Sequence, residues 1–196
     1  MLIIGLTGSI GVGKTNVARE FRALHVPVFD ADRAVHKMLS PGGEAVKKVA
    51  EIFPAALEKN QIDRKKLGDI VFGDKKKLQL LEKILHPLVR RAEKKFLQKA
   101  QGQKKKMAVL DIPLLFEKGF FRICDYTIVV VAPHFVQKHR VMRRRHMSHE
   151  KFLAIIASQM PQAKKMRLAD FVIRAGLDKR STNRQVRAIY AALCAK

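Results

Sequence analysis

The sequence predicts an α/β fold in which helices flank a parallel sheet, with a helical insert and a helical lid added to that core. Three observations support this prediction. Short apolar runs recur along the chain like buried strands, the first of them leads through a glycine-rich turn into an amphipathic segment, and two long stretches show only helical periodicity. Strands that alternate with helices in this way form parallel sheets, with the crossover helices on the sheet faces.

The opening of the chain has the pattern strand, loop, helix, strand. Leu2–Leu6 is an apolar run that ends at Thr7-Gly8, and Val26–Phe29 is a second apolar run. Between them, apolar residues recur at helical spacing: Val17, Ala18, Phe21 and Leu24. This order predicts a βαβ unit at the start of the core.

A long helical pattern follows, from Arg33 to about Gln103. Its clearest apolar stripe consists of Leu78, Leu81, Leu85, Leu88, Ala92 and Phe96. Pro87 interrupts this stripe, so we expect a kink or the start of a new helix there. Asp63 and Asp74 are placed to cap neighbouring helices.

Strand character returns at Met107–Ile112 and Tyr126–Val131. His134–Arg145 and Ser148–Met160 then read as two helices. Phe171–Ile173 is a last short strand candidate.

A capping box of Thr182 with Gln185 is expected to open the C-terminal helix. The predicted domains are a core of residues 1–32, 104–133 and 167–196, a helical insert of residues 33–103 and a helical lid of residues 134–166.

Composition limits the function classes. The chain has 40 Lys and Arg against 17 Asp and Glu, a formal net charge of +23, which attracts anionic ligands. No zinc-finger spacing or RNA-binding motif accompanies this charge, so we expect no specific nucleic-acid partner. The two cysteines lack metal-ligand spacing, and the longest apolar run is too short to span a bilayer. We therefore expect a cytoplasmic protein with reduced cysteines and no membrane partner, and the oligomeric state stays open.

The strongest motif is the phosphate-binding pattern G-x-x-x-x-G-K-[ST]. It consists of Gly8, Ser9, Ile10, Gly11, Val12, Gly13, Lys14 and Thr15. Glycines let successive main-chain N–H groups turn toward phosphates, and the following helix directs its positive end at the same anion. Lys14 is expected to reach the β and γ phosphates, and the Thr15 hydroxyl is expected to bind Mg²⁺. The fold is therefore a three-layer P-loop NTPase type, while the motif alone does not choose between kinase, ATPase and GTPase.

Acidic residues follow two of the predicted strands. Asp30 and Asp32 stand at the carboxyl end of the second strand, the edge where open α/β sheets bind ligands. A phosphoryl acceptor needs a carboxylate to accept its proton, and Asp32 is our candidate for this base. Either aspartate is also placed to cap the next helix. Asp111 ends a later strand and is a candidate second ligand of Mg²⁺.

The predicted lid is rich in arginine. Arg140 and Arg144 are four residues apart and would share a helical face, with Arg143 and Arg145 as adjacent alternatives. Guanidinium groups in a lid can neutralise charge on a transferred phosphoryl group. A solvated basic helix is the structural alternative.

Taken together, these motifs resemble the dephospho-CoA kinase family. The elements that carry the resemblance are the opening Gly5–Thr15, the element Asp30-Ala31-Asp32, the element Leu85-His86-Pro87, the element Pro113-Leu114-Leu115-Phe116-Glu117, the lid arginines Arg140 to Arg144 and the stretch Ser158-Gln159-Met160-Pro161. The chain departs from the family after the last strand, where Ile173–Gly176 lacks the usual Asn in a loop that commonly approaches adenine. It departs again at Arg145 and His146, where the family often has an acidic residue.

The resemblance implies ATP-dependent phosphorylation of the ribose 3′-hydroxyl of dephospho-CoA, which gives coenzyme A and ADP. It implies that Asp32 is the base, that the insert grips the acceptor with His86 on the acceptor side, and that Arg140 and Arg144 belong to the nucleotide lid. Two alternatives stay open: another small-molecule P-loop kinase, such as a shikimate-like or nucleoside kinase, and a nucleic-acid-binding P-loop NTPase.

Overall fold

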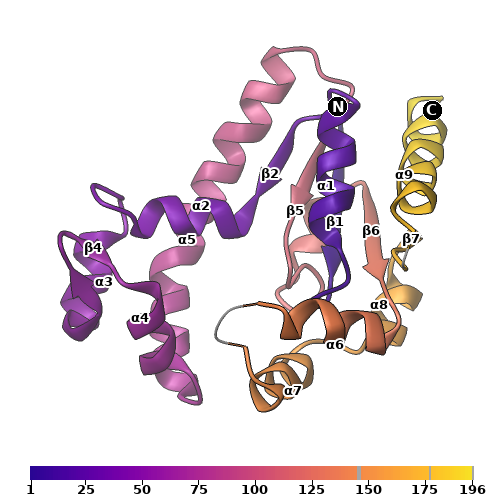
Figure 1. Cartoon of the computed structure of the whole chain (residues 1–196). Coiled ribbons are helices and arrows are strands. Elements are labelled where there is room, and N and C mark those ends of the chain that lie inside the picture. Colours follow the sequence, from indigo (N-terminus) through magenta and orange to yellow (C-terminus); the bar gives the residue numbers. More distant parts are fainter. Residues whose placement is uncertain (145–146, 177, 196) are drawn as a thin grey trace. The chain divides into compact units, whose positions relative to one another are not determined.

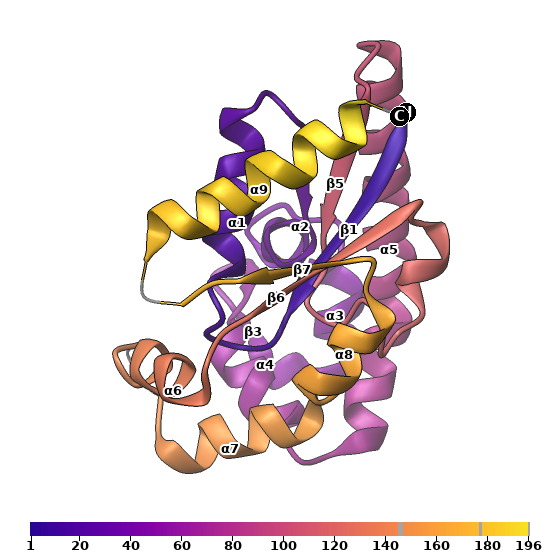
Figure 2. The same cartoon turned by 90° about the vertical axis from the view of Figure 1, so that its right-hand side faces the viewer.

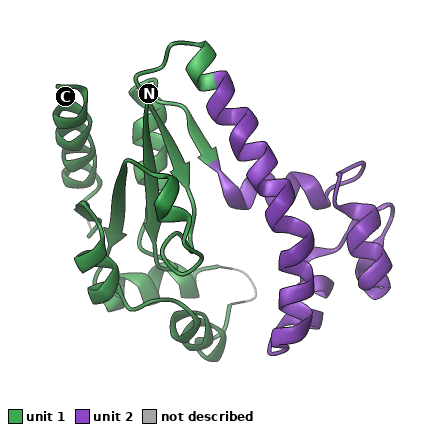
Figure 3. Ribbon diagram, turned by 180° about the vertical axis from the view of Figure 1, so that it is seen from behind, with its two compact units in different colours: residues 1–29, 100–196 green, residues 30–99 purple. Residues whose placement is uncertain are grey.

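The computed structural model describes residues 1–144, 147–176 and 178–195, and it divides the chain into two compact units (Figure 3). Unit 1 contains Met1–Phe29 and Ala100–Lys196, and unit 2 contains Asp30–Lys99. The second unit is therefore inserted between two strands of the first.

Unit 1 is built on a five-stranded sheet with the order β2-β5-β1-β6-β7 (Figure 1). The strands are β1 (Leu2–Gly8), β2 (Val28–Asp30), β5 (Met107–Asp111), β6 (Tyr126–Val131) and β7 (Phe171–Arg174). β1 is parallel to both of its neighbours, with Leu6 in register with Asp111 of β5 and with Ile128 of β6. These parallel neighbours bring the carboxyl ends of their strands to one edge of the sheet, as the sequence predicts.

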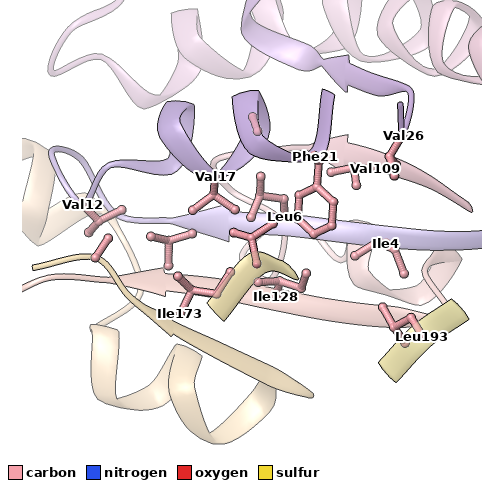
Figure 4. Packing of buried hydrophobic residues seen from close by; sticks show 14 of the residues in the cluster. Ile4, Leu6, Val12, Val17, Phe21, Val26, Val109, Ile128, Ile173 and Leu193 are labelled. Atoms are coloured by element: carbon pink, nitrogen blue, oxygen red, sulfur yellow. The ribbon is translucent and has the colours of Figure 1, made fainter. Parts of the chain in front are cut away.

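Two helices cover one face of this sheet, α1 (Lys14–Ala23) and α9 (Lys179–Cys194), and they pack against each other (Figure 2). Their apolar sides meet the sheet in a cluster that includes Val17, Phe21, Leu6, Ile128 and Leu193 (Figure 4). Phe21 and Leu6 are completely buried. The predicted amphipathic segment after the phosphate-binding motif is thus confirmed as a core helix.

The region of the predicted lid contains three helices rather than two: α6 (His134–Met142), α7 (His149–Ser158) and α8 (Gln162–Leu168). The third follows Pro161, which stands at its N-cap. Proline favours the start of a helix because its φ angle is fixed near the helical value. The spacing of apolar residues alone does not reveal this boundary. Arg145 and His146 lie outside the described residues.

The C-terminal helix begins earlier than the predicted capping box. Its N-cap is Asp178, whose carboxylate accepts from the N–H groups of Arg180 at 2.8 Å and Ser181 at 2.9 Å. Thr182 lies inside the helix and donates its hydroxyl to the Asp178 carbonyl. Gln185 bonds to Arg174 of β7 instead of closing a box. The capping-box prediction is wrong because a carboxylate cap four residues upstream already satisfies the first turn.

Unit 2 is mostly helical. Its elements are α2 (Ala31–Leu39), α3 (Val46–Ile52), the 3₁₀ turn η1 (Pro54–Ala56), β3 (Leu57–Glu58), β4 (Gln61–Ile62), α4 (Arg64–Val71) and α5 (Lys75–Gly102), whose last turn reaches into unit 1. Asp63 caps α4 as predicted, and Asp74 accepts the N–H groups of Lys76 and Lys77 in the first turn of α5.

Two expectations for this region are wrong. The all-helical pattern is interrupted by the small antiparallel pair β3–β4. Of the two possibilities for Pro87, the start of a new helix is wrong, because the 28-residue helix α5 runs through it, and a kink there stays a prediction. Leu81, Leu85 and Leu88 are buried on both sides of the proline, so packing of this stripe holds the helix together where one main-chain hydrogen bond is missing.

Candidate active site

The phosphate-binding loop joins β1 to α1 and requires its glycines. Gly11 has φ 77° and Gly13 has φ 102°, a left-handed backbone that residues with a Cβ rarely adopt. A Cβ on Gly11 would lie 2.9 Å from the carbonyl oxygen of Gln137 and 2.7 Å from Val141 Cγ2. The loop therefore turns tightly and packs directly against α6, the first helix of the predicted lid.

Lys14 and Asp111 form an ion pair beside this loop. The ammonium of Lys14, in the first turn of α1, donates to Asp111 Oδ1 at the end of β5. Their side chains are 17% and 6% exposed. The pair brings together two residues that the sequence singled out separately, because β5 is the direct neighbour of β1.

Arg140 connects the phosphate-binding loop to the loop after β7. Its guanidinium donates to the carbonyl oxygens of Gly11 at 3.4 Å and Val12 at 2.8 Å, and to those of Ala175 at 3.2 Å and Gly176 at 2.5 Å. A planar fork of donors suits this arrangement of several acceptors. The structure thus places Arg140 at the nucleotide-binding motif, with its donors directed at main-chain oxygens.

Arg144 does not share a helical face with Arg140. α6 ends at Met142, and Arg144 stands beyond it with an exposed side chain. Its N–H bonds to the Val141 carbonyl in a closing turn. The expectation of an i, i+4 pair is therefore wrong, because the helix stops two residues too early.

Arg140 also borders a pocket of about 530 Å³ next to the loop. The pocket is lined by Gly13, Thr15, Asn16, Arg19, Arg22, Arg140, Ala175, Gly176, Asp178, Lys179 and Thr182. Its walls thus come from the end of the phosphate-binding loop and α1, from α6, from the loop after β7 and from the first turn of α9. Four of the lining side chains are cationic, which suits an anionic ligand.

A second group of contacts reaches the loop from α7 and α8. The N–H of Ile10 donates to Gln159 Oε1 at 3.1 Å. The next residue, Met160, donates its N–H to Glu117 Oε1 at 2.9 Å, and Glu117 pairs with Lys165 at 2.8 Å. In the sequence, Glu117 and Gln159 stand out only as parts of the family elements. Their roles cannot be predicted from it, because contacts such as that of Ile10 with Gln159, 149 positions apart, leave no local signal.

The acidic candidates after β2 have different surroundings. Asp30 is the N-cap of α2, and its carboxylate accepts the Arg33 N–H at 2.9 Å. Asp32 lies in the first turn of α2 with an exposed side chain, and its carboxylate has no hydrogen bond or ion pair among residues 1–144, 147–176 and 178–195. Asp30 thus takes the capping role, which leaves the Asp32 carboxylate available.

Unit 2 also contains a pocket of about 380 Å³. Its lining comes from α2, the turn after it and α5: Ala34, Lys37, Met38, Ser40, Pro41, Gly42, Gly43, Glu44 and Ala92. His86 is half-buried within α5. The approach of Asp32 and His86 to the phosphate-binding loop stays a prediction.

The side chains of the described residues do not build a metal cage. Within the part of the chain that the structure describes, no three His, Cys, Asp or Glu residues gather in a way that could hold an ion. Nor does that part contain a helix both long and apolar enough to span a bilayer. Thr15 beside the loop and the Asp111 carboxylate suit Mg²⁺, which is usually bound through one or two protein oxygens together with substrate phosphates.

Comparison with known proteins gives one consistent result. The family model described as dephospho-CoA kinase matches residues 2–179. The chain is 45% identical over 189 residues to the dephospho-CoA kinase of Bartonella quintana (strain Toulouse), covering 96% of each chain. Among solved structures, TT1252 from Thermus thermophilus superposes with a TM-score of 0.86 at 34% identity, covering 98% of this chain and 97% of that one. The dephospho-CoA kinase from Campylobacter jejuni superposes with a TM-score of 0.65 at 25% identity, covering 97% and 96%.

Proposed function

The chain belongs to the dephospho-CoA kinase family, and from this premise we propose which of its residues carry out the reaction. The reaction transfers the γ-phosphoryl group of ATP to the ribose 3′-hydroxyl of dephospho-CoA and gives coenzyme A and ADP. The two alternatives, another small-molecule kinase and a nucleic-acid-binding NTPase, are not favoured, because the family match extends over almost the whole chain.

The nucleotide binds at the loop of residues 8–15. Its main-chain N–H groups surround the terminal phosphates, and Lys14 contacts the β and γ phosphates from its position beside Asp111. The observation that carries this assignment is the pocket of about 530 Å³ at the loop, with Arg140 joining both of its main-chain walls. Arg140 brings positive charge to the transferred group, and Arg144, beyond the end of α6, is a further contact to the nucleotide.

Mg²⁺ accompanies the nucleotide. Thr15 would offer its hydroxyl, and Asp111 on the strand next to β1 would offer a carboxylate, to a cation bound to the phosphates. The cation supplies charge neutralisation on the phosphate oxygens.

Asp32 accepts the proton of the ribose 3′-hydroxyl. Its carboxylate is exposed and is not engaged by a described partner, while the neighbouring Asp30 supplies the helix cap. The acceptor occupies unit 2, where His86 and the pocket beside α2 contribute to its binding. The excess of positive charge attracts these anionic ligands without a specific nucleic-acid partner, and we assign the reaction to the cytoplasm.

The acceptor assignment is tested by ADP release. Purified protein is incubated with MgATP and, in separate reactions, dephospho-CoA, shikimate, a nucleoside or DNA. We expect turnover with dephospho-CoA alone, and a preference for another acceptor would refute the assignment.

The base is tested with Asp32→Asn. Loss of the proton acceptor should lower kcat by about 10²–10⁴-fold and leave the affinity for MgATP unchanged. Asp69→Asn is the matched control, because Asp69 is an exposed aspartate on α4 of the same unit. Wild-type kcat in the Asp32 variant would exclude Asp32 as the base.

A further inference from the structure

The N–H of Ile10 is not directed into the loop but outward to a side chain. It donates to the amide oxygen of Gln159, 3.1 Å away. Ile10 is the third residue of the phosphate-binding motif, between the strand-end Gly8 and the left-handed Gly11. A hydrogen bond at this position fixes the first half of the loop. The main-chain N–H groups after Ile10 therefore stay oriented as the turn directs them.

The backbone of Gln159 is itself fixed by a buried ion pair. Its neighbour Met160 donates its N–H to Glu117 Oε1 at 2.9 Å, and the same carboxylate pairs with Lys165 Nζ at 2.8 Å. Lys165 has no exposed surface. Burial raises the pKa of Glu117, but the ion pair with Lys165 and the hydrogen bond from the Met160 N–H outweigh this effect and hold the pKa below its ordinary value. The carboxylate is therefore ionised and engaged at neutral pH.

The helix that carries Lys165 is anchored independently. Gln162, the first residue of α8, accepts the Ala132 N–H at 3.2 Å and donates to the Ala132 carbonyl at 3.3 Å. Ala132 directly follows β6, a strand next to β1 in the sheet. A continuous set of contacts thus runs from the sheet through α8 and Glu117 to Gln159 and then to the loop.

We propose that Gln159 is a positioning residue for the phosphate-binding loop and that the Glu117–Lys165 pair acts through it. The proposal rests on the proposed nucleotide site, and it adds two roles. Gln159 holds the loop in its phosphate-accepting shape, and the buried pair determines where Gln159 stands. If the ion pair served stability alone, its removal would change the free energy of unfolding and leave nucleotide affinity unchanged. Affinity for MgADP in the absence of acceptor is therefore the decisive measurement.

Gln159→Met tests the first role. Methionine keeps the length of the side chain and removes the amide oxygen, so the Ile10 N–H loses its partner. We expect the dissociation constant for MgADP, measured by titration calorimetry, to rise about tenfold, which corresponds to one lost hydrogen bond. KM for dephospho-CoA should stay within about twofold, because the lost hydrogen bond lies in the nucleotide loop and not at the acceptor. Gln101→Met is the control, because it makes the same change at an exposed glutamine.

The second role is tested by removing both charges in Glu117→Gln/Lys165→Met, which leaves no buried ion unpaired. This variant should also weaken MgADP binding, and the same pair of changes should have no further effect in the Gln159→Met background. Wild-type affinity of Gln159→Met overturns the proposal. If the rise in the MgADP dissociation constant of the combined variant is the product of the two separate rises, the pair does not act through Gln159. The MgADP titrations do not use dephospho-CoA, so a wrong acceptor would leave their result intact, whereas a wild-type protein without affinity for MgADP would refute both proposals.

Discussion

Replacing Arg140 by methionine should loosen the connection between the two loops at the nucleotide pocket. The change removes four donated bonds, of which those to Val12 at 2.8 Å and Gly176 at 2.5 Å are short and those to Gly11 and Ala175 are longer. A bond from a charged donor contributes about 1.5–3 kcal/mol. Counting the two short bonds at the lower value, and allowing water to reach part of this half-buried site, gives a loss of about 2–3 kcal/mol in the free energy of unfolding.

Thermal and urea unfolding measure this loss. For a chain of this size the expected fall in Tm is about 4–12 °C. Arg144→Met is the control for stability, because it removes an exposed guanidinium beyond the end of the same helix and should change stability by less than about 0.5 kcal/mol. Equal unfolding free energies for the two variants would refute the view that Arg140 joins the loops.

Three further predictions concern the stability contributed by single residues within each unit. Gly11→Ala should cost more stability in urea than Gly42→Ala, because both glycines have positive φ but only Gly11 has atoms of α6 in the way, and equal losses would contradict this. Burial raises the pKa of Glu93 above its ordinary value of 4.5, so stability is lost as the pH rises past that value and the carboxyl group ionises in the folded state. Glu93→Gln should therefore raise Tm at about pH 8 and have little effect at about pH 4. An equal rise in Tm at both pH values would exclude this cause. Phe21→Ala should cost about 3–5 kcal/mol in urea unfolding, and Phe135→Ala, at 66% exposure, should cost almost nothing; similar losses would contradict the core described above.

The sequence predicted the features that depend on neighbouring residues. The strand β6 has the predicted bounds, and the glycine-rich turn before Lys14 was evident because the loop conformation is encoded in consecutive residues. Asp63 was recognisable as a cap for the same reason, since a cap acts on N–H groups two or three residues away.

The sequence could not show features that depend on residues far apart. The bond between Ile10 and Gln159 and the pair of Glu117 with Lys165 require the whole sheet to be assembled first. The local rule also left two outcomes open at Pro87, and the start of a new helix is wrong because the buried apolar stripe of α5 keeps the helix continuous. These failures share one cause, which is that tertiary packing decides between local alternatives of similar energy.

The order of strands in the sheet also governs when the protein can fold during synthesis. β1 emerges from the ribosome well before its partners, because Leu2 pairs with Met107 and Ile4 pairs with Tyr126. Both edges of this apolar strand therefore stay unpaired until β5 and β6 have been made. Such delayed pairing slows folding and exposes a strand that favours aggregation, so a nascent chain that ends before β5 is expected to need chaperone protection.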